Sequence, residues 1–506
     1  MKKIMLFFMM LSVALSLHGE NLIEGRAIWA HPRDLGTSET EVKAFFDLLE
    51  KCHITVVFPL VKNTGGAIFW HSRKFPEAIH PDYRDFDLLE AAVRYAHRSR
   101  IKIHPWLCDF PESRNSAAYI KHPEWAMLNP EGGNTSQEKL DHDRPYNPVW
   151  MCPARRPGYV DQWLIPMIEE IVRDYDVDGI HHDYVRYPGD VAPDSYCFCD
   201  YCLENYLVYN HFYYPSRPHD TIVLKKVLPR EEANWHNDLT LRPQNWDKMT
   251  RAEKADYLLN GKSVNRNDLD YYFYETRADA ITRFVKESTE RARKIKPEIE
   301  ISAAVFINPM RSGRHIGQRW TDFAQWIDIL APMNYRSHFQ GSFEDYLVYL
   351  SDYVKSQKGW CDGQSALYPG ITGHYIYREE REPWEKALDI LETNSSETEK
   401  DILRGEIAKC VSYLEQFSPE SAKNIETTYS NYTEGKVDPN ILVDELRKVL
   451  SDPPPGFFPE EKFLRTIQTV RKAGAEGVTI FAAGILTRNK LWPALERAFS
   501  RGLKAP

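Results

Sequence analysis

Short apolar runs alternate with longer amphipathic stretches along most of the chain. The short runs are nearly continuous in apolar and β-branched residues, as expected of parallel strands buried on both faces. Eight strand–helix repeats predict an α/β fold, closed into a (β/α)8 TIM barrel. The runs are Gly25–His31, Ile54–Val61, Ile101–Cys108, Val177–Tyr184, Ile299–Phe306, Ile327–Tyr335, Ala366–Ile371 and Gly477–Ala483.

The longer stretches show the three-to-four-residue spacing of helices that cover a sheet. In the last of them Ala278, Ile281, Phe284 and Val285 fall on one face, with charged residues on the other. We therefore expect this face to pack on the barrel. The predicted helices include Glu39–Cys52, Leu88–Ser99, Gly158–Tyr175 and Tyr272–Lys296.

Two segments interrupt the alternation. Residues 190–270 follow the fourth strand and are rich in Tyr, Cys, Asn and Trp, whereas residues 375–460 follow the seventh and are helical and charged in pattern. Because both leave the carboxyl ends of strands, we expect two large insertions on the rim above the active face. Residues 20–506 are accordingly predicted to form a single barrel domain.

The first residues have the pattern of a secretory signal peptide. Lys2 and Lys3 precede an apolar run over residues 4–17, with a small-x-small cleavage pattern at 14–16. A membrane anchor is the alternative, but the run is shorter than the roughly 20 residues that a span needs. We predict that residues 1–19 are removed and that the protein is exported without stable membrane insertion.

The net charge and the absence of one motif argue against two kinds of ligand, nucleic acids and nucleotide cofactors. The 506 residues carry a net charge of −9, whereas nucleic-acid binding requires a basic surface. No glycine-rich phosphate loop follows a strand, so we expect no nucleotide cofactor.

A polar cluster directly follows the apolar start of the fourth strand. It comprises His181, His182, Asp183, Tyr184, Arg186 and Tyr187. Barrel enzymes carry their catalytic groups at the carboxyl ends of strands, so the cluster predicts an active site. Because side chains alternate along a strand, His181 and Asp183 share one face while His182 points to a covering helix.

This run resembles the fourth strand of glycosyl-hydrolase-like family 10, bacterial proteins with a (β/α)8 barrel. The matching residues are Asp178-Gly179-Ile180-His181, Asp183-Tyr184 and Arg186-Tyr187-Pro188, with a departure at His182, where an apolar residue is more usual. Further matches are Arg26–Trp29, His122–Trp125 and Ala331–Tyr335. The resemblance spans about residues 24–490. It implies an exported glycoside hydrolase acting on a polysaccharide, with peptidoglycan glycan strands as one candidate.

Glycosidases use two carboxyl groups that flank the scissile bond. Asp183 is the first candidate catalytic residue, although it could instead serve as a structural partner of Arg186 or His181. For the second we choose Asp109 at the end of the third strand, with Glu112 behind it. A carboxylate from the first insertion remains open: Asp190, Asp194 or Asp200.

Aromatic and polar residues near strand ends suit a sugar, whose apolar ring faces stack on aromatics and whose hydroxyls need hydrogen-bond partners. Aromatics make up 13% of the chain, more than a core alone requires. Under the resemblance, we expect an oligo- or polysaccharide to contact Trp29, His31, Trp106, His181, Arg186, Tyr187, Asn334 and Tyr335.

Two other functions remain open. A glycan-binding barrel without catalysis would explain why the fifth and sixth strands end without an acid. A metal-dependent hydrolase would use His181 and Asp183 with His31 or His104. The leading interpretation assigns no catalytic metal and no cofactor.

Three closely spaced cysteines, Cys197, Cys199 and Cys202, fit two structural roles. They could hold a zinc ion together with His211 or His219, or they could form one disulfide and leave one thiol. The spacing does not decide between the two.

Overall fold

The computed structural model describes residues 24–138, 148–206, 242–261, 269–361, 363–393 and 397–500. The predicted signal peptide lies outside these residues. Among the helices of the described residues, none is long and apolar enough to cross a membrane.

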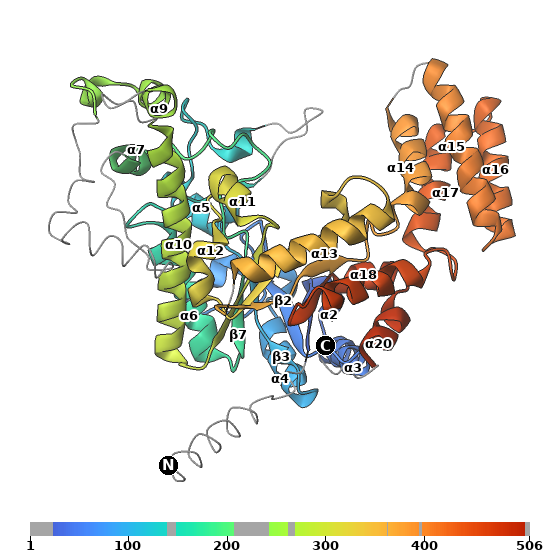
Figure 1. The fold of residues 1–506 in the computed structure, drawn as a ribbon, viewed down its shortest axis with the longest axis horizontal. Coiled ribbons are helices and arrows are strands. Elements are labelled where there is room, and N and C mark those ends of the chain that lie inside the picture. Colours follow the sequence, from blue (N-terminus) through green and yellow to red (C-terminus); the bar gives the residue numbers. More distant parts are fainter. Residues whose placement is uncertain are drawn as a thin grey trace, which may run out of the picture.

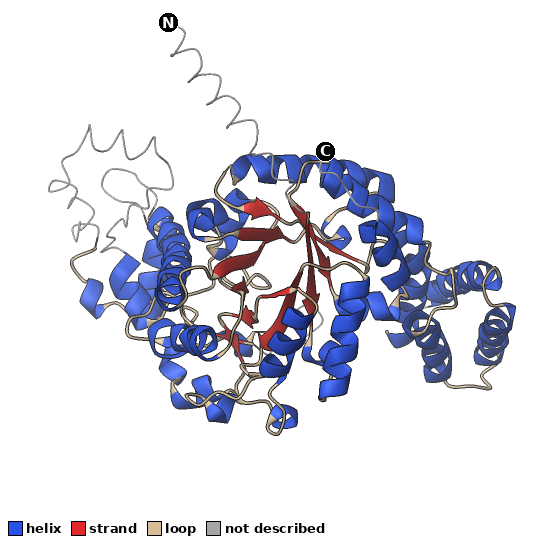
Figure 2. Cartoon of the chain, turned by 90° about the horizontal axis from the view of Figure 1, so that it is seen from below, coloured by secondary structure: helices blue, strands red, loops and turns tan. Residues whose placement is uncertain are grey.

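A parallel sheet forms the centre of the fold and is surrounded by helices (Figure 2). Its strands are hydrogen-bonded in the order β10-β9-β8-β7-β4-β2-β1-β12-β11, and β3 pairs with β2. The fold is the predicted barrel. The strands are β1 (Gly25–Ala30), β2 (Val56–Lys62), β3 (Lys102–Ile103), β4 (Trp106–Cys108), β7 (Gly179–Asp183), β8 (Glu300–Val305), β9 (Ile329–Pro332), β10 (Ala366–Leu367), β11 (Gly370–Thr372) and β12 (Gly477–Phe481).

Two of the eight predicted strands are each divided by a proline. Pro105 separates β3 from β4, and Pro369 separates β10 from β11. Proline has no backbone N–H to donate to a neighbouring strand, so the ladder is interrupted there. The two halves of the seventh strand pair with different neighbours, β10 with β9 and β11 with β12. The ring therefore closes through this divided strand.

Three of the four predicted helices begin and end within two residues of their predicted bounds. The helix predicted over Gly158–Tyr175 is a π-helix over Val160–Leu164 that continues as an α-helix from Ile165. Ser38 and Asp87 each accept a hydrogen bond from the first turn of the helix that follows, which fixes where two of the helices begin. The covering helices are α3 (Glu39–Lys51), α4 (Leu88–Arg98), α6 (Ile165–Asp174), α10 (Asp270–Ile295), α13 (Phe343–Trp360), α18 (Glu460–Lys472) and α20 (Trp492–Ser500).

The apolar face predicted for α10 is confirmed. Ala278, Ile281, Phe284 and Val285 are all fully buried. Burying a large apolar side chain contributes about 1.5–3 kcal/mol, so this face supplies much of what holds α10 against the barrel.

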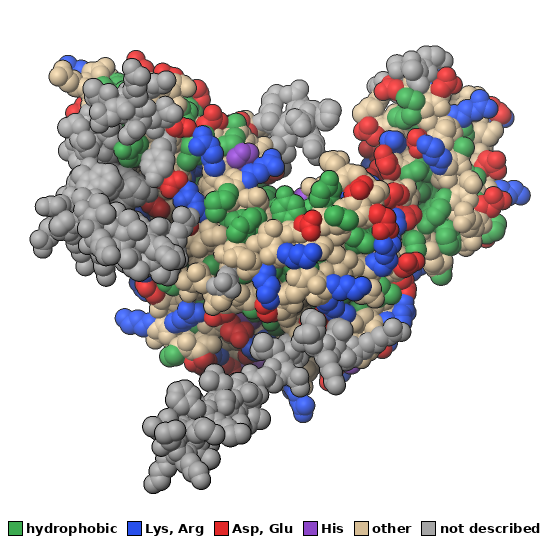
Figure 3. Space-filling model, in the orientation of Figure 1, with side chains coloured by type: hydrophobic (Ala, Val, Ile, Leu, Met, Phe, Trp, Pro, Cys, Tyr) green, Lys and Arg blue, Asp and Glu red, His purple; other side chains and the backbone are tan. Residues whose placement is uncertain are grey.

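Helices also occupy both segments that interrupt the repeat. Between the fourth and fifth strand positions lie α7 (Asp200–Tyr206) and α9 (Arg251–Asn260). After β11, a bundle projects to one side of the barrel (Figure 1). The molecular outline is hollowed between α9 and this bundle (Figure 3). The bundle contains α14 (Arg378–Glu392), α15 (Glu397–Glu415), α16 (Pro419–Thr433) and α17 (Pro439–Ser451).

A third excursion was not expected from the sequence. It follows β4 and contains an antiparallel pair, β5 (Pro111–Glu112) with β6 (Val149–Trp150). A short helix, α5 (Ala117–Lys121), lies between these strands in sequence. The strands are too short to produce a periodic pattern, so hydrophobic spacing gave no signal for them.

Candidate active site at the carboxyl end of the barrel

A pocket of about 450 Å³ lies at the carboxyl ends of the strands. This is the end at which barrel enzymes assemble their catalytic groups. Seven of the eight strand positions contribute to its wall, through residues in or directly after the strands: Trp29, Leu60, Cys108, Asp183, Ala304, Met333 and Phe481.

Asp183 lies in this wall as the last residue of β7. Its Oδ2 accepts a hydrogen bond from Trp106 Nε1 at 3.0 Å, and its Oδ1 accepts one from the Tyr184 backbone N–H at 2.6 Å. Tyr184 has a φ of 51°, a left-handed conformation that is costly for a bulky side chain. Such strain is concentrated at functional sites, where the surrounding structure holds it in place.

The surroundings of Asp183 favour its protonated form. Burial raises the pKa of the carboxyl to about 6, although its two hydrogen bonds and the nearby Arg186 oppose that shift. Charges cost free energy where water is excluded, and here that cost exceeds the stabilisation from the donors. Among the described residues that line the pocket, Asp183 provides the only carboxyl group.

Aromatic rings line much of the pocket. Trp29 and Tyr335 each lie beside Phe481, with ring centroids 5.8 and 5.3 Å apart, and His31 lies 5.3 Å from Trp106. Flat apolar rings interspersed with a few polar groups are typical of small-molecule pockets.

Arg186 contributes a cation to the same wall. Its guanidinium lies over the rings of Trp150, Tyr184 and Phe306, at 5.0, 4.9 and 5.2 Å from their centroids. It also donates a hydrogen bond to the Tyr187 carbonyl at 3.0 Å. These contacts hold the charge beside Asp183 without a direct ion pair to it.

His181 lies one layer below the pocket, inside the barrel. Its Nε2 accepts a hydrogen bond from Trp29 Nε1 at 2.9 Å, and its Nδ1 is 2.8 Å from Ser302 Oγ. The Phe58 ring stacks on the imidazole at 4.0 Å, and burial lowers its pKa well below the usual value. A neutral His181 therefore fixes the Trp29 indole from beneath.

Asp109 does not reach the pocket. It is fully buried on the outer side of the sheet, where its Oδ2 is 3.0 Å from His182 Nδ1. His182 in turn faces α10, with Nε2 3.3 Å from Ser288 Oγ. The predicted orientation of His182 is therefore confirmed, and Asp109 follows it into the layer between sheet and helix.

Tyr187 and Asn334 also lie outside the pocket lining. Tyr187 is buried under the Arg277 guanidinium, 4.4 Å from the ring centroid. Asn334 exchanges two hydrogen bonds with the Gln357 side chain of α13, at 2.9 and 3.0 Å. Glu112, the reserve candidate, forms a buried ion pair with Lys62 at 3.1 Å.

Several pocket residues were missed by the sequence reasoning. Asn63 and Thr64 directly follow β2, and His338 lies in the turn after β9. The change from apolar to polar residues at the end of the second strand is the signal that could have indicated the first two. Phe481 gave no signal, because a phenylalanine in a strand usually packs in a core.

The residues considered for a metal-dependent hydrolase do not form one cluster. His104 and His181 both contact Ser302 Oγ inside the barrel, at 3.0 and 2.8 Å, whereas His31 and Asp183 lie in the pocket wall. Within the described parts of the chain, no three potential metal ligands come together at the barrel mouth.

Comparison with known proteins gives a family and a fold. The model of the family described as glycosyl hydrolase-like 10 matches residues 25–378. The chain is similar to the solved glycoside hydrolase domain of PgaB (BpsB) from Bordetella bronchiseptica, with 11% identity and a TM-score of 0.54, covering 95% of this chain and 100% of that one. No curated protein sequence matches.

Two further solved structures match with lower TM-scores. Alpha-L-fucosidase isoenzyme 2 from Paenibacillus thiaminolyticus has 15% identity and a TM-score of 0.37, over 72% of this chain and 50% of that one. Beta-galactosidase from Bacillus circulans sp. alkalophilus has 13% identity and a TM-score of 0.44, over 69% and 44%.

Proposed function

The chain belongs to the glycosyl hydrolase-like 10 family, and on that premise we propose that it hydrolyses O-glycosidic bonds of a polysaccharide in the Asp183 pocket. The observation that carries the proposal is the Asp183 carboxyl, with its raised pKa, in an aromatic-lined pocket at the catalytic end of a barrel. The charged and apolar pattern of residues 2–17 supports export, and an exported enzyme would meet extracellular or cell-wall polysaccharides.

In this proposal Asp183 is the general acid. A glycosidase acid must hold a proton near its working pH, and burial of the carboxyl serves that purpose. Asp183 donates the proton to the leaving glycosidic oxygen as the bond to the anomeric carbon breaks. Trp106 orients the carboxyl through its hydrogen bond to Oδ2.

The group that attacks the anomeric carbon is proposed to come from the substrate. Some glycosidases use no enzyme carboxylate as the nucleophile, because the 2-acetamido group of the sugar supplies the attacking oxygen. Water then opens the cyclic intermediate and returns a proton to Asp183. Both sugars of peptidoglycan glycan strands carry such a group, so these strands are the first substrate to test.

Pocket residues are assigned to binding by their position. Trp29, Trp106 and Tyr335 offer rings to the apolar faces of sugars, and His31 and Arg186 offer donors to hydroxyl or acetamido oxygens. His181 acts through Trp29, which makes it a positioning residue in this proposal.

Release of reducing ends from a panel of glycans tests the function. The panel contains purified peptidoglycan glycan strands, their N-deacetylated form, and soluble plant and algal polysaccharides. We expect release from N-acetylated strands and at most a trace from the deacetylated form. Glycan binding without any product would contradict hydrolysis and favour the non-catalytic binding barrel.

The activity should fall as the pH rises through the pKa of Asp183. The free enzyme needs this carboxyl protonated, so kcat/KM should decline above about pH 6. Measuring kcat/KM for a soluble glycan as a function of pH tests for this decline. Activity that instead rises through pH 6 would mean that Asp183 acts as a carboxylate, either as nucleophile or as base.

Replacing Trp106 by phenylalanine should move the decline of kcat/KM to higher pH. The indole N–H stabilises the charged form of Asp183, so its loss raises the pKa of the carboxyl further. Trp29→Phe is the matched control, because the Trp29 N–H donates to His181 instead. If kcat/KM declines at the same pH in both variants, the Trp106 hydrogen bond does not influence the pKa of Asp183.

A further inference from the structure

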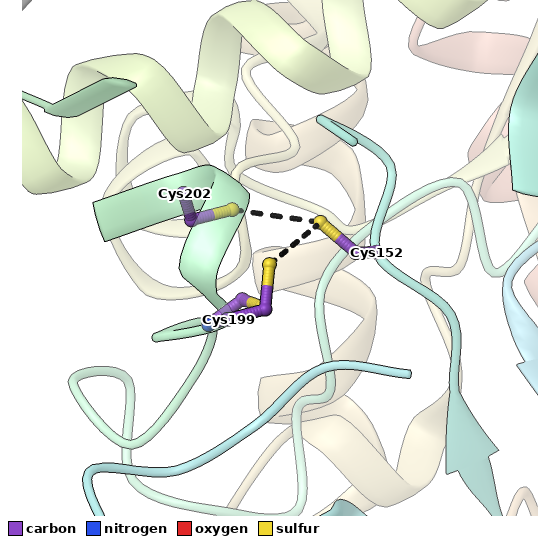
Figure 4. Close-up of side chains that lie close together, drawn as sticks. Cys152, Cys199 and Cys202 are labelled. Carbon is purple, nitrogen blue, oxygen red and sulfur yellow. Dashed lines mark hydrogen bonds between the residues drawn. The ribbon is translucent and has the colours of Figure 1, made fainter. Parts of the chain in front are cut away.

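Four cysteine side chains converge outside the pocket. The sulfur atoms of Cys152, Cys197, Cys199 and Cys202 all lie within 4.8 Å of one another, and each residue is at most 1% exposed. Figure 4 shows Cys199 and Cys202 directing their sulfurs at Cys152. We propose that these four cysteines bind one zinc ion, which fastens two rim excursions of the barrel to each other.

Two of the sulfur–sulfur distances match those of a tetrahedral zinc site. With zinc–sulfur bonds of about 2.3 Å, neighbouring sulfurs of a tetrahedron lie about 3.8 Å apart. The Sγ atom of Cys152 is 3.5 Å from that of Cys202 and 3.9 Å from that of Cys199. Cys152 thus takes the place of the fourth ligand that was predicted to be His211 or His219, both of which lie outside the described residues.

The surroundings suit a negatively charged metal–thiolate group. The Cys199 backbone N–H donates a hydrogen bond to Cys197 Sγ at 3.4 Å, which stabilises charge on that sulfur. Four thiolates around Zn²⁺ carry roughly two negative charges in excess. They require positive charge nearby, because isolated buried charge is costly.

Arg277 provides such a charge. It is 1% exposed, and its guanidinium donates to the backbone carbonyls of Pro193 and His315, at 2.6 and 3.2 Å. Among the described residues no carboxylate lies within ion-pair distance of it. Cys197 is among the titratable neighbours of this guanidinium, so a metal–thiolate group would supply the counter-charge that it lacks.

The site joins segments that are distant in sequence. Cys152 follows β6 in the excursion after the third strand. In the insertion after the fourth strand, Cys197 and Cys199 precede α7 and Cys202 lies in its first turn. Trp150, two residues before Cys152, packs against the Arg186 guanidinium in the pocket wall. A metal ion bound here would therefore fix the segment that packs behind the pocket wall. Its contribution would be to the stability of the fold.

Disulfides are the competing state, since export exposes cysteines to oxidation. A sulfur–sulfur bond is about 2.05 Å long, and all four cysteines are free thiols in this structure. Deep burial also shields them from oxidants.

Metal content and thiol state of the purified full chain test the proposal. We expect one zinc per chain by elemental mass spectrometry, and the mass of a fully reduced chain after denaturation. A purified chain without zinc would overturn the proposal. This holds whether its four cysteines form disulfides or remain free thiols.

Single variants locate the site. Cys152→Ser and Cys202→Ser should lose most of the bound zinc and lower the Tm. Cys410→Ser, a buried free thiol in α15, is the matched control and should keep its zinc. Full zinc retention in Cys152→Ser would rule out this ligand set.

Cobalt provides a readout if the variants fail to fold. Wild-type protein produced with Co²⁺ in place of zinc should show thiolate-to-cobalt charge-transfer bands and the visible spectrum of a tetrahedral site. A cobalt spectrum without thiolate bands would contradict a four-cysteine site.

Discussion

Replacing Asp183 by asparagine should lower kcat/KM for glycan hydrolysis by about 10²–10⁴-fold, the usual contribution of a general acid. An amide has nearly the shape of the carboxyl but cannot give a proton to the leaving oxygen. Its single oxygen can keep one of the two hydrogen bonds that Asp183 accepts, from Trp106 or from the Tyr184 backbone, but its NH2 group cannot accept the other. We therefore expect the fold and glycan binding to be retained with a lower Tm, measured by thermal unfolding and by binding to undigested strands.

Asp109→Asn is the informative comparison for this variant. Asp109 is buried beside His182 and away from the pocket, so its replacement should act mainly on stability. A large loss of kcat in Asp109→Asn, with Asp183→Asn still active at a matched Tm, would transfer the acid role to Asp109. Reducing-end release by both variants, measured at the same pH, distinguishes the two assignments.

Alternation along strands explains why part of this site could be predicted from the sequence. His182 packs toward α10, as expected, because its neighbours His181 and Asp183 occupy the opposite face. The same rule places Asp109 and Asn334 outside the pocket, since Cys108 and Tyr335 line it. Its place at a strand end made Asp109 a candidate, but alternation directs its side chain to the face opposite that of Cys108.

Depth in the barrel was harder to predict. His181 faces the interior as expected but lies below the pocket, because it is two residues nearer the start of β7 than Asp183. Periodicity gives the face of a side chain and not its height along the barrel axis. The height depends on how neighbouring strands are staggered, which only the closed sheet reveals.

Distant partners could not be predicted by spacing. Cys152 lies far upstream of the other three cysteines, and only the β5–β6 excursion brings it to them. The repeat of strands and helices, in contrast, is a local pattern that each segment carries by itself. The barrel was therefore predictable, while the metal site on its rim required the folded chain.

Replacing Lys62 by methionine should lower the free energy of unfolding by about 3–5 kcal/mol, the usual cost of breaking a buried ion pair. Lys62 and Glu112 are both fully buried, with Nζ 3.1 Å from Oε1. The ammonium also donates to the carbonyls of Cys108 and Pro111, at 2.7 and 3.0 Å. Methionine fills a similar volume but leaves the Glu112 carboxylate without its counter-charge. Denaturant unfolding with an unchanged m-value measures the loss.

A double-variant cycle separates the ion pair from simple packing. Glu112→Gln keeps the hydrogen bond from Tyr159 to this side chain but leaves the Lys62 charge unpaired. Each single variant then holds one uncompensated buried charge, whereas Lys62→Met/Glu112→Gln holds none. We expect the double variant to be less destabilised than the sum of the singles by more than the ~0.5 kcal/mol that independent sites show. Additive losses would mean that the pair contributes only through the volume of its side chains, and that other groups neutralise each charge.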